Sequence, residues 1–146
     1  MTMKKLNRKG FTLIELLAVI VVLAIVLVVT IPSVLNSMNN ARTDQFKNAV
    51  ATVEKYMKDQ IDACFLGDTT LANYDEAIFT KDTNDNPTCE IDISKGPDIA
   101  AKAGYKNGEF QSITVTKEGK VTAATAGGKF SGAEDYKIAT TTTPQE

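Results

Sequence analysis

Residues 8–31 of this 146-residue chain read RKGFTLIELLAVIVVLAIVLVVTI, and this stretch decides the fold. After Arg8 and Lys9, Glu15 is the only charged residue in the stretch. A charged side chain inside a bilayer costs about 2.5–3.5 kcal/mol on insertion scales. A carboxylate in such a position requires a compensating partner, and we expect that partner to explain the function.

The apolar part of this stretch is long enough to cross a membrane as a helix. No charged residue occurs from Leu16 to Ala41, and about 20 apolar residues span the hydrocarbon core of a bilayer. A secretory signal peptide instead has about 7–15 apolar residues followed by a cleavage site with small residues. The sequence shows neither feature, so it predicts a membrane anchor.

Basic residues predict how the anchor is oriented. Four basic residues lie within positions 4–9, whereas the first one after the apolar stretch is Arg42. Because basic residues favour the cytoplasmic side, we expect a cytoplasmic N-terminus and an outward-facing chain after about Ile31. The N-terminal leader holds four of the 16 basic residues and none of the 18 acidic ones. The outer part is therefore acidic, which disfavours a general surface for nucleic acid or other polyanions but leaves a local basic patch open.

Two cysteines, Cys64 and Cys89, fall in the part predicted to lie outside the cell. An even cysteine count in that location favours a disulfide, which would close a loop of about 25 residues and contribute about 3 kcal/mol. Two buried free thiols are the alternative. The chain has no histidine and no CxxC spacing, so a metal cluster, a thiol nucleophile and histidine general-base catalysis are disfavoured. We expect no enzyme activity and no cofactor.

A helical pattern continues beyond the apolar stretch. We expect one helix over residues 11–65, with Gly67 as its stop signal, and with its second half packed on a soluble core. Pro32 should kink or loosen this helix; the alternative is that the helix ends there and a second one begins. Apolar residues recur at spacings of three and four at Phe46, Ala49, Val50, Val53, Met57, Ile61 and Cys64.

The remaining chain predicts a loop region and then an antiparallel sheet. Residues 68–97 are rich in Asp, Asn, Thr and Gly, which is typical of loops and turns. Alternation of apolar and polar residues predicts the later strands, which we expect to form a sheet of three or four strands on the long helix. The expected elements are short strands or turns at 77–79 and 90–93, a helical turn at 98–103, and strands at 110–117, 121–125 and 136–139.

One short motif is similar to a calcium-binding loop. Asp82, Asn84 and Asn86 alternate in the way that calcium-ligating oxygens do. Pro87 stands where such a loop requires glycine, and Ile93 stands at its twelfth position, where a glutamate is needed. We therefore expect a solvated turn and no metal site.

The residues KGFTLIE at 9–15, after a basic leader and before about 20 apolar residues, closely resemble the class III signal of type IV prepilins. The resemblance implies that a membrane peptidase cuts between Gly10 and Phe11 on the cytoplasmic side and methylates the new amine of Phe11. Glu15 matches the glutamate five residues into the family's mature chain, and Pro32 matches its helix-kinking proline. The resemblance is strong to about residue 32 and extends in layout to about residue 65.

The resemblance also implies a role for Glu15 in assembly. Cleavage leaves a positive amine on Phe11, and an unpaired charge is costly in the bilayer. In the family, the amine of a neighbouring subunit pairs with this glutamate and sets the register of subunits as their apolar helices bundle into a filament. The disulfide of many family members closes a C-terminal loop, whereas Cys64 and Cys89 would join the long helix to the segment after it.

The resemblance implies an α+β, pilin-like fold, in which the second half of a long N-terminal helix packs on a small antiparallel sheet. The expected divisions are a cleaved basic leader at 1–10, a transmembrane and filament-core half-helix at 11–32, an amphipathic half-helix at 33–66, a domain of loop plus antiparallel sheet at 67–139 and a flexible tail at 140–146.

The implied function is that of a structural subunit of a type IV pilus that serves adhesion, surface motility or aggregation. A pseudopilin of a type II secretion or competence system is the first alternative, and an anchored surface binding domain that never polymerises is the second. The implied partners are other pilin subunits, possible minor pilins, the prepilin peptidase and a membrane assembly platform. The chain would occupy the membrane before assembly and the cell surface afterwards.

Overall fold

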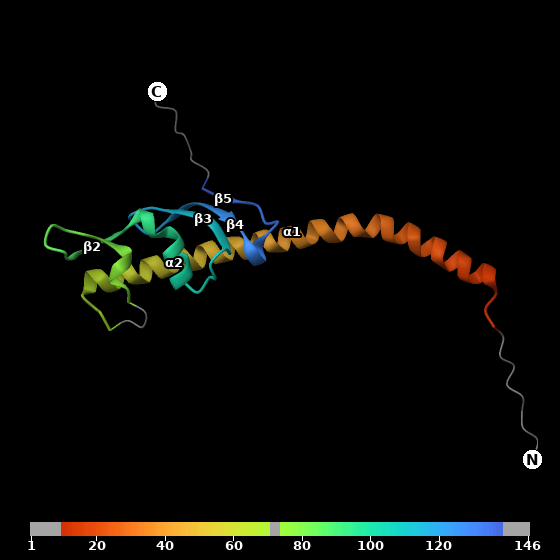
Figure 1. Cartoon of the computed structure of the whole chain (residues 1–146), viewed down its shortest axis with the longest axis horizontal. Helices are drawn as coiled ribbons and strands as arrows, with labels where there is room; N and C mark the ends of the chain where they lie inside the picture. Colours follow the sequence, from red (N-terminus) through yellow and green to blue (C-terminus); the bar gives the residue numbers. More distant parts are fainter. Residues whose placement is uncertain (1–9, 71–73, 139–146) are drawn as a thin grey trace, which may run out of the picture. The chain divides into compact units, whose positions relative to one another are not determined.

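The computed structural model describes residues 10–70 and 74–138 (Figure 1). A long N-terminal helix is followed by small antiparallel sheets, which confirms the predicted α+β, pilin-like class. The leader up to residue 9, the end of the last predicted strand and the tail at 140–146 lie outside the described residues. The elements are α1 (Leu13–Leu66), β1 (Phe79–Lys81), β2 (Pro87–Ile91), α2 (Gly96–Lys102), β3 (Phe110–Val115), β4 (Val121–Ala126) and β5 (Tyr136–Lys137).

Helix α1 runs without interruption from Leu13 to Leu66 and contains Pro32. The alternative in which the helix ends at Pro32 is therefore wrong, and the predicted continuous helix begins and ends within two residues of the expected positions. Gly67 follows the helix with a φ of 65°, a conformation that favours glycine and commonly ends helices. The kink at Pro32 stays a prediction.

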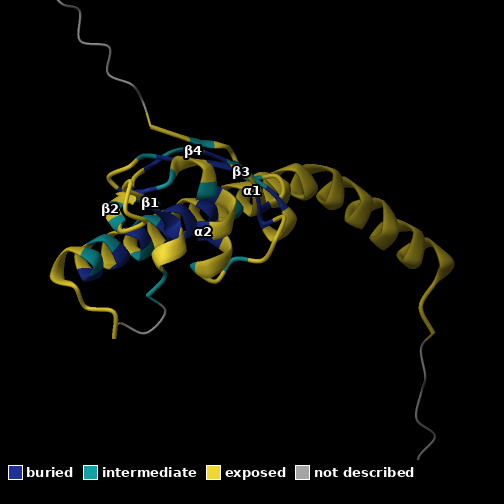
Figure 2. Ribbon diagram, turned by 60° about the vertical axis from the view of Figure 1, so that its left-hand side comes forward, coloured by how far each residue is buried: buried dark blue, intermediate teal, exposed yellow. Residues whose placement is uncertain are grey.

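The chain divides into two units, of which the first ends at Met38 and the second begins at Asn39. In the described part of the first unit every residue is exposed, as Figure 2 shows by colour. Helix α1 contains a window that is long and apolar enough to cross a membrane, and none of that window is buried. The described part of the first unit, residues 10–38, therefore has no core of its own.

The second unit, called the head domain below, has a hydrophobic core built on one face of α1. The predicted stripe is confirmed from Phe46 to Met57, and Ile61 and Cys64 at its end are partly buried. The rings of Phe110 and Phe130 lie 5.2 Å and 5.4 Å from the ring of Phe46, between centroids. Other core side chains come from elements after α1: Ile78, Phe79, Ile91, Ile99, Ile113, Val115 and Val121.

The strands form two separate sheets, a two-stranded one of β1 and β2 and a three-stranded one in the order β3-β4-β5. All pairings are antiparallel. The larger sheet consists of the three strands expected at 110–117, 121–125 and 136–139, in chain order. The smaller sheet forms where the sequence indicated only short strands or turns, and its β2 donates a hydrogen bond from the Ile91 N–H to the Lys117 carbonyl after β3.

A bulge in β3 changes which side chains face the core. Strict alternation places Phe110 on the opposite face from Ile113 and Val115, yet all three are buried. The register of β3 with β4 shifts between Phe110 and Ser112. Because a bulge adds one residue to a strand, the side chains on its two sides change face relative to a regular strand.

Polar side chains of α1 hold three distant segments of the head domain. Two of the three residues, Thr43 and Gln60, are buried on the core face of the helix. A buried backbone N–H without an acceptor would destabilise the fold by about 1–3 kcal/mol. Thr43 accepts a hydrogen bond from the N–H of Glu134 at 3.0 Å, Glu54 from that of Val121 at 2.8 Å and Gln60 from that of Asp75 at 2.8 Å.

Candidate functional site

Glu15 lies in the first turn of α1 and is bonded to Thr12 of the same chain. Its Oε2 atom accepts hydrogen bonds from the Thr12 backbone N–H at 2.8 Å and from the Thr12 hydroxyl at 2.9 Å. The Thr12 Oγ1 atom in turn accepts a bond from the Glu15 N–H at 3.3 Å. This reciprocal pattern is a capping box, which satisfies N–H groups that have no partner within a helix.

The capping box leaves Glu15 available to a second group. Glu15 is exposed, and a carboxylate offers about four lone-pair positions, of which Thr12 uses only those on one oxygen. A negative side chain is also favourable beside the positive N-terminal end of the helix dipole. The sequence interpretation missed Thr12, although the pattern T-L-I-E at 12–15 has the spacing of a capping box.

The predicted cleavage site is open. Gly10 and Phe11 precede the helix, and Phe11 is 85% exposed. No atom lies within 4 Å of the place where a Cβ at Gly10 would be. A hollow of about 460 Å³, lined mostly by apolar side chains, adjoins Phe11 and Glu15. Both predicted processing residues therefore lie where another molecule can reach them.

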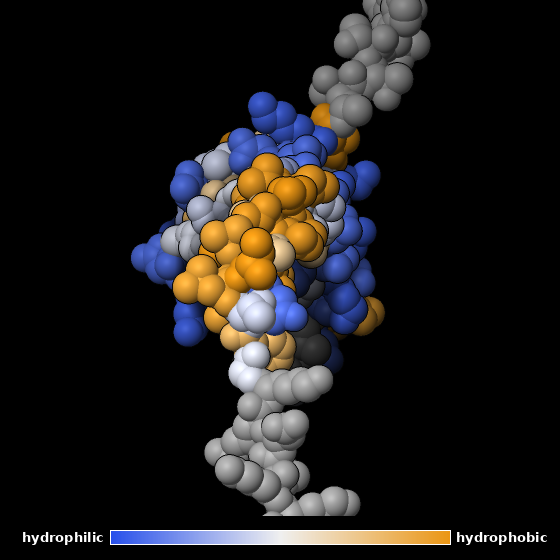
Figure 3. Space-filling model, turned by 90° about the vertical axis from the view of Figure 1, so that its right-hand side faces the viewer, coloured by the Kyte–Doolittle hydropathy of each residue, from blue (hydrophilic) through white to orange (hydrophobic). Residues whose placement is uncertain are grey.

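The apolar surface of the first unit is continuous along the helix. Figure 3 shows hydrophobic side chains gathered on it. From Leu13 to Met38, the bulky apolar side chains are 47% to 82% exposed. An apolar surface of this extent indicates contact with a membrane or with other proteins.

Cys64 and Cys89 form a disulfide in the structure, with Cα atoms 5.6 Å apart. The bond joins the end of α1 to β2 in the smaller sheet. Cys89 has a φ of 59°, which is uncommon for any residue other than glycine. The disulfide therefore holds the smaller sheet to the helix at a residue with an unusual backbone conformation.

The loop at Asp82 is a hydrogen-bonded turn. The Asp82 Oδ1 atom accepts bonds from the N–H groups of Asn86 at 2.9 Å and Asn84 at 2.8 Å. These bonds, chiefly the one from Asn86, lower the pKa of Asp82 below its ordinary value. The carboxylate is thus engaged by its own loop, and the described residues include no group of three or more acidic, cysteine or histidine side chains that could hold a metal ion.

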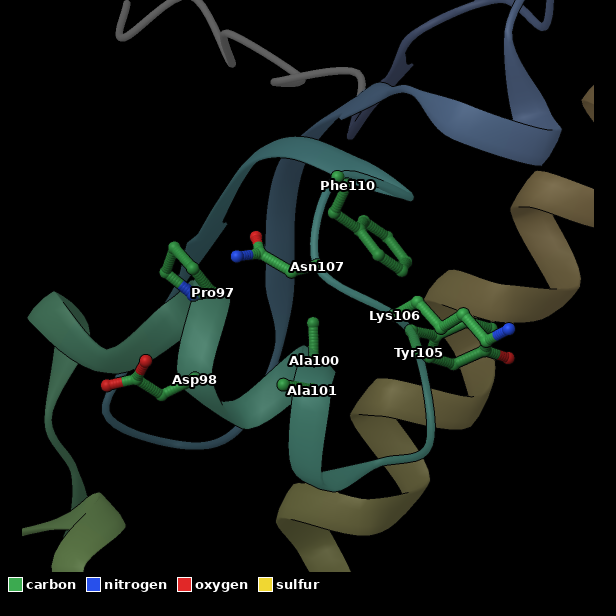
Figure 4. Close-up of a pocket in the computed structure, with 9 residues that line it drawn as sticks. Pro97, Asp98, Ala100, Ala101, Tyr105, Lys106, Asn107 and Phe110 are labelled. Atoms are coloured by element: carbon green, nitrogen blue, oxygen red, sulfur yellow. The ribbon is translucent and has the colours of Figure 1, made fainter.

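A hollow of about 160 Å³ lies in the head domain between α2 and the segment after it (Figure 4). Asp98 on α2 and Asn107 in that segment are polar residues of its lining, and Phe110 is an apolar one. Its lining, within the described part of the chain, includes no serine, cysteine or histidine. Among the described residues, the lining therefore offers no Ser-His or Cys-His pair.

Residues 5–31 match the family model of the prokaryotic N-terminal methylation motif. This motif is the class III signal peptide of type IV pilins, so the resemblance predicted from the sequence is confirmed. It indicates a pilin- or pseudopilin-like precursor, a structural protein and not an enzyme, and together with the apolar helix it supports anchoring in a membrane before assembly. Among curated proteins and solved structures, none matches the chain.

Proposed function

We propose that this chain is a structural subunit of a type IV pilus, cleaved after Gly10, methylated on the amine of Phe11 and polymerised through its apolar helix. The observation that carries the proposal is an exposed apolar helix that begins within the methylation motif and holds Glu15 in its first turn. In this proposal residues 1–10 are the leader, residues 11–32 serve the membrane and then the filament core, and the head domain forms the outer surface.

The role proposed for Glu15 follows from the change of environment on assembly. In lipid, apolar helices gain no hydrophobic free energy by associating, because lipid tails are as apolar as the side chains. We therefore expect a charged pair buried among these helices to fix the register of neighbouring subunits more than to strengthen their association. Thr12 partners Glu15 in the single subunit, and the methylated amine of a neighbouring Phe11 would become its second partner in the filament.

The proposed partners and locations follow from this role. The prepilin peptidase acts on the precursor in the membrane, an assembly platform extracts the processed subunit, and other pilin subunits, including minor pilins, form the filament. The product is an extracellular filament at the cell surface. There the head domain would support adhesion, surface motility or aggregation.

A pseudopilin of a type II secretion or competence system is the second candidate function, because it would carry the same N-terminal motif. The turn at Asp82 bears on this choice, because a calcium loop there would favour the major secretion pseudopilin. The Asp82 carboxylate instead accepts hydrogen bonds from backbone N–H groups of its own loop, which weighs mildly against that pseudopilin. An anchored domain that never polymerises is disfavoured by the methylation motif, because that domain would keep its N-terminus from Met1 onward.

The substitution Glu15→Leu tests the proposal in cells that express the assembly machinery. We expect the variant to be cleaved and to accumulate in the membrane, because leucine removes a charge from the bilayer, while the yield of sheared filaments falls strongly. Glu118→Leu is the matched control, because Glu118 is an exposed head-domain glutamate, and it should assemble normally. A wild-type filament yield from Glu15→Leu would refute the proposed pairing.

A further inference from the structure

Two adjoining hollows of about 260 Å³ and 240 Å³ lie on the head domain where α1 meets the end of α2. Tyr56 and Lys102 line both of them, and the two hollows together are called the Tyr56 furrow below. Among the described residues, its lining includes none from the first unit. Its principal side chains are Lys55, Tyr56, Asp59, Tyr74, Asp75 and Lys102.

The charged groups of the Tyr56 furrow neutralise one another. Lys55 pairs with Asp59 at 3.4 Å, and Lys102 pairs with Asp75. An anionic polymer or a cationic peptide would need an excess of one sign, which these four groups do not provide. Each ammonium has three donors, of which its ion pair uses one, and the carboxylates keep acceptor positions that the pairs leave unused. The furrow therefore offers hydrogen bonds of both kinds without net charge.

The two tyrosines supply flat apolar surfaces that are already fixed in place. Tyr56 and Tyr74 are partly buried and pack against the core of the head domain, with the Tyr74 ring centroid 6.2 Å from that of Phe79. Burial raises the pKa of Tyr56, which keeps its hydroxyl neutral. A ring that is held by packing loses little conformational freedom when a ligand binds to its exposed side.

We propose that the Tyr56 furrow binds a neutral oligosaccharide. A sugar ring presents an apolar face that can lie against a tyrosine and a rim of hydroxyl groups that both donate and accept hydrogen bonds. It carries no charge, which matches the paired lysines and carboxylates. A lipid chain would displace water from these two ion pairs and offer their remaining donors and acceptors no hydrogen bonds, which is unfavourable. The inference goes beyond the proposed filament function and does not depend on it.

The test uses the full chain, isotope-labelled, in micelles of a phosphocholine detergent that has no sugar headgroup. Lactose, cellobiose and N,N′-diacetylchitobiose are titrated while amide chemical shifts are followed. At least one of them should shift the amides of Tyr56, Tyr74 and Lys102 in a saturable way. Tyr56→Leu, which keeps an apolar side chain but removes the flat ring and hydroxyl, should weaken that binding about tenfold.

Tyr136→Leu is the control, because Tyr136 lies in β5 and lines neither hollow; it should bind as the unaltered chain does. Unchanged spectra outside the furrow confirm that the Tyr56→Leu head domain is folded. The proposal is overturned if none of the three sugars shifts the furrow amides, or if Tyr56→Leu binds normally. Binding of heparin or of phosphatidylcholine vesicles at the furrow in place of sugar would also overturn it. Filament yield should be the same for both variants, so failure here leaves the filament proposal intact.

Discussion

The two halves of α1 show how one helix can serve two kinds of surroundings. From Leu13 to Met38 the bulky apolar side chains are 47% to 82% exposed, whereas Phe46, Val53 and Met57 are fully buried. The second half finds its apolar partners within the same chain. The first half finds none among the described residues, and an apolar surface of this extent indicates lipid or other proteins as its partners.

The acidic residues of the two halves differ in the same way. Glu15 bonds to Thr12, three residues away, and stays exposed. Glu54 bonds to the N–H of Val121, which lies 67 residues further along the chain. The Glu54 carboxylate is hydrogen-bonded within the head domain, whereas Glu15 is available to bind another molecule. The predictions below test this division.

The largest effect is expected at the cleavage site. Gly10→Val should leave full-length precursor in the membrane, because a glycine without a side chain allows the peptidase to approach the backbone closely. Intact-mass measurement of the membrane-bound chain distinguishes the precursor from the product. Thermal unfolding of the head domain should be unchanged, and normal processing of Gly10→Val would count against the cleavage assignment.

Among the changes to stability, Phe46→Ala should be the most severe. Phe46 is fully buried and contacts the rings of Phe110 and Phe130, so the free energy of unfolding should fall by about 3–5 kcal/mol. Leu27→Ala, on the exposed half of α1, should leave head-domain unfolding within about 0.5 kcal/mol of the unaltered chain. Urea denaturation of both variants measures the contrast, and equal losses would contradict it.

Removing the disulfide tests how far the stability of the head domain depends on the link between α1 and the smaller sheet. Replacing Cys64 and Cys89 together by alanine should lower the free energy of unfolding by about 3 kcal/mol, because the bond closes a loop with a sequence separation of 25 residues. Glycine at position 89 should restore about 1 kcal/mol relative to alanine, since the φ of 59° there favours glycine. Chemical denaturation compares the two variants; a more stable alanine variant would argue against the strained conformation of Cys89.

A smaller loss is expected at Glu54. Glu54→Ala removes the acceptor of the Val121 N–H and should destabilise the head domain by about 1–3 kcal/mol. Glu54→Gln keeps a carbonyl acceptor and should cost less. Hydrogen exchange at the Val121 amide provides the local measurement. Equal protection in all three proteins would show that this hydrogen bond does not hold β4 to the helix.

The smallest effect is a dependence of stability on pH at Glu109. Burial alone would raise its pKa, but hydrogen bonds from the Lys129 side chain and the Lys106 N–H outweigh burial and lower the pKa below the ordinary 4.5. The stabilisation is therefore complete above the unfolded-state pKa and is lost as the pH falls through the lower folded-state pKa. Glu109→Gln should unfold with a flatter pH profile in acid, and an unchanged profile would contradict this assignment.

Local patterns predicted much of this structure, and the failures have identifiable causes. The stripe from Phe46 to Met57 depends only on helical spacing, so it was readable from the sequence. The faces of β3 were not, because the bulge at Phe110 comes from pairing with β4. The hydrogen bond from the Asp75 N–H to Gln60 was not predictable either, because it joins segments that come together only when the chain folds.

The methylation motif was easier to predict than the head domain for the same reason. Gly10, Phe11 and Glu15 lie within six consecutive positions, and their spacing carries the motif. The capping role of Thr12 could have been predicted from the same local sequence pattern. The Tyr56 furrow combines residues from α1, from the segment before β1 and from α2, and no sequence pattern brings these together.

Mass spectrometry of the N-terminal peptide, from filaments sheared off cells that produce this chain, tests the central claim most directly. We expect a peptide that begins with N-methylated Phe11. A chain that begins at Met1 in the membrane, with no copy of it in any filament or secretion assembly, would contradict the account.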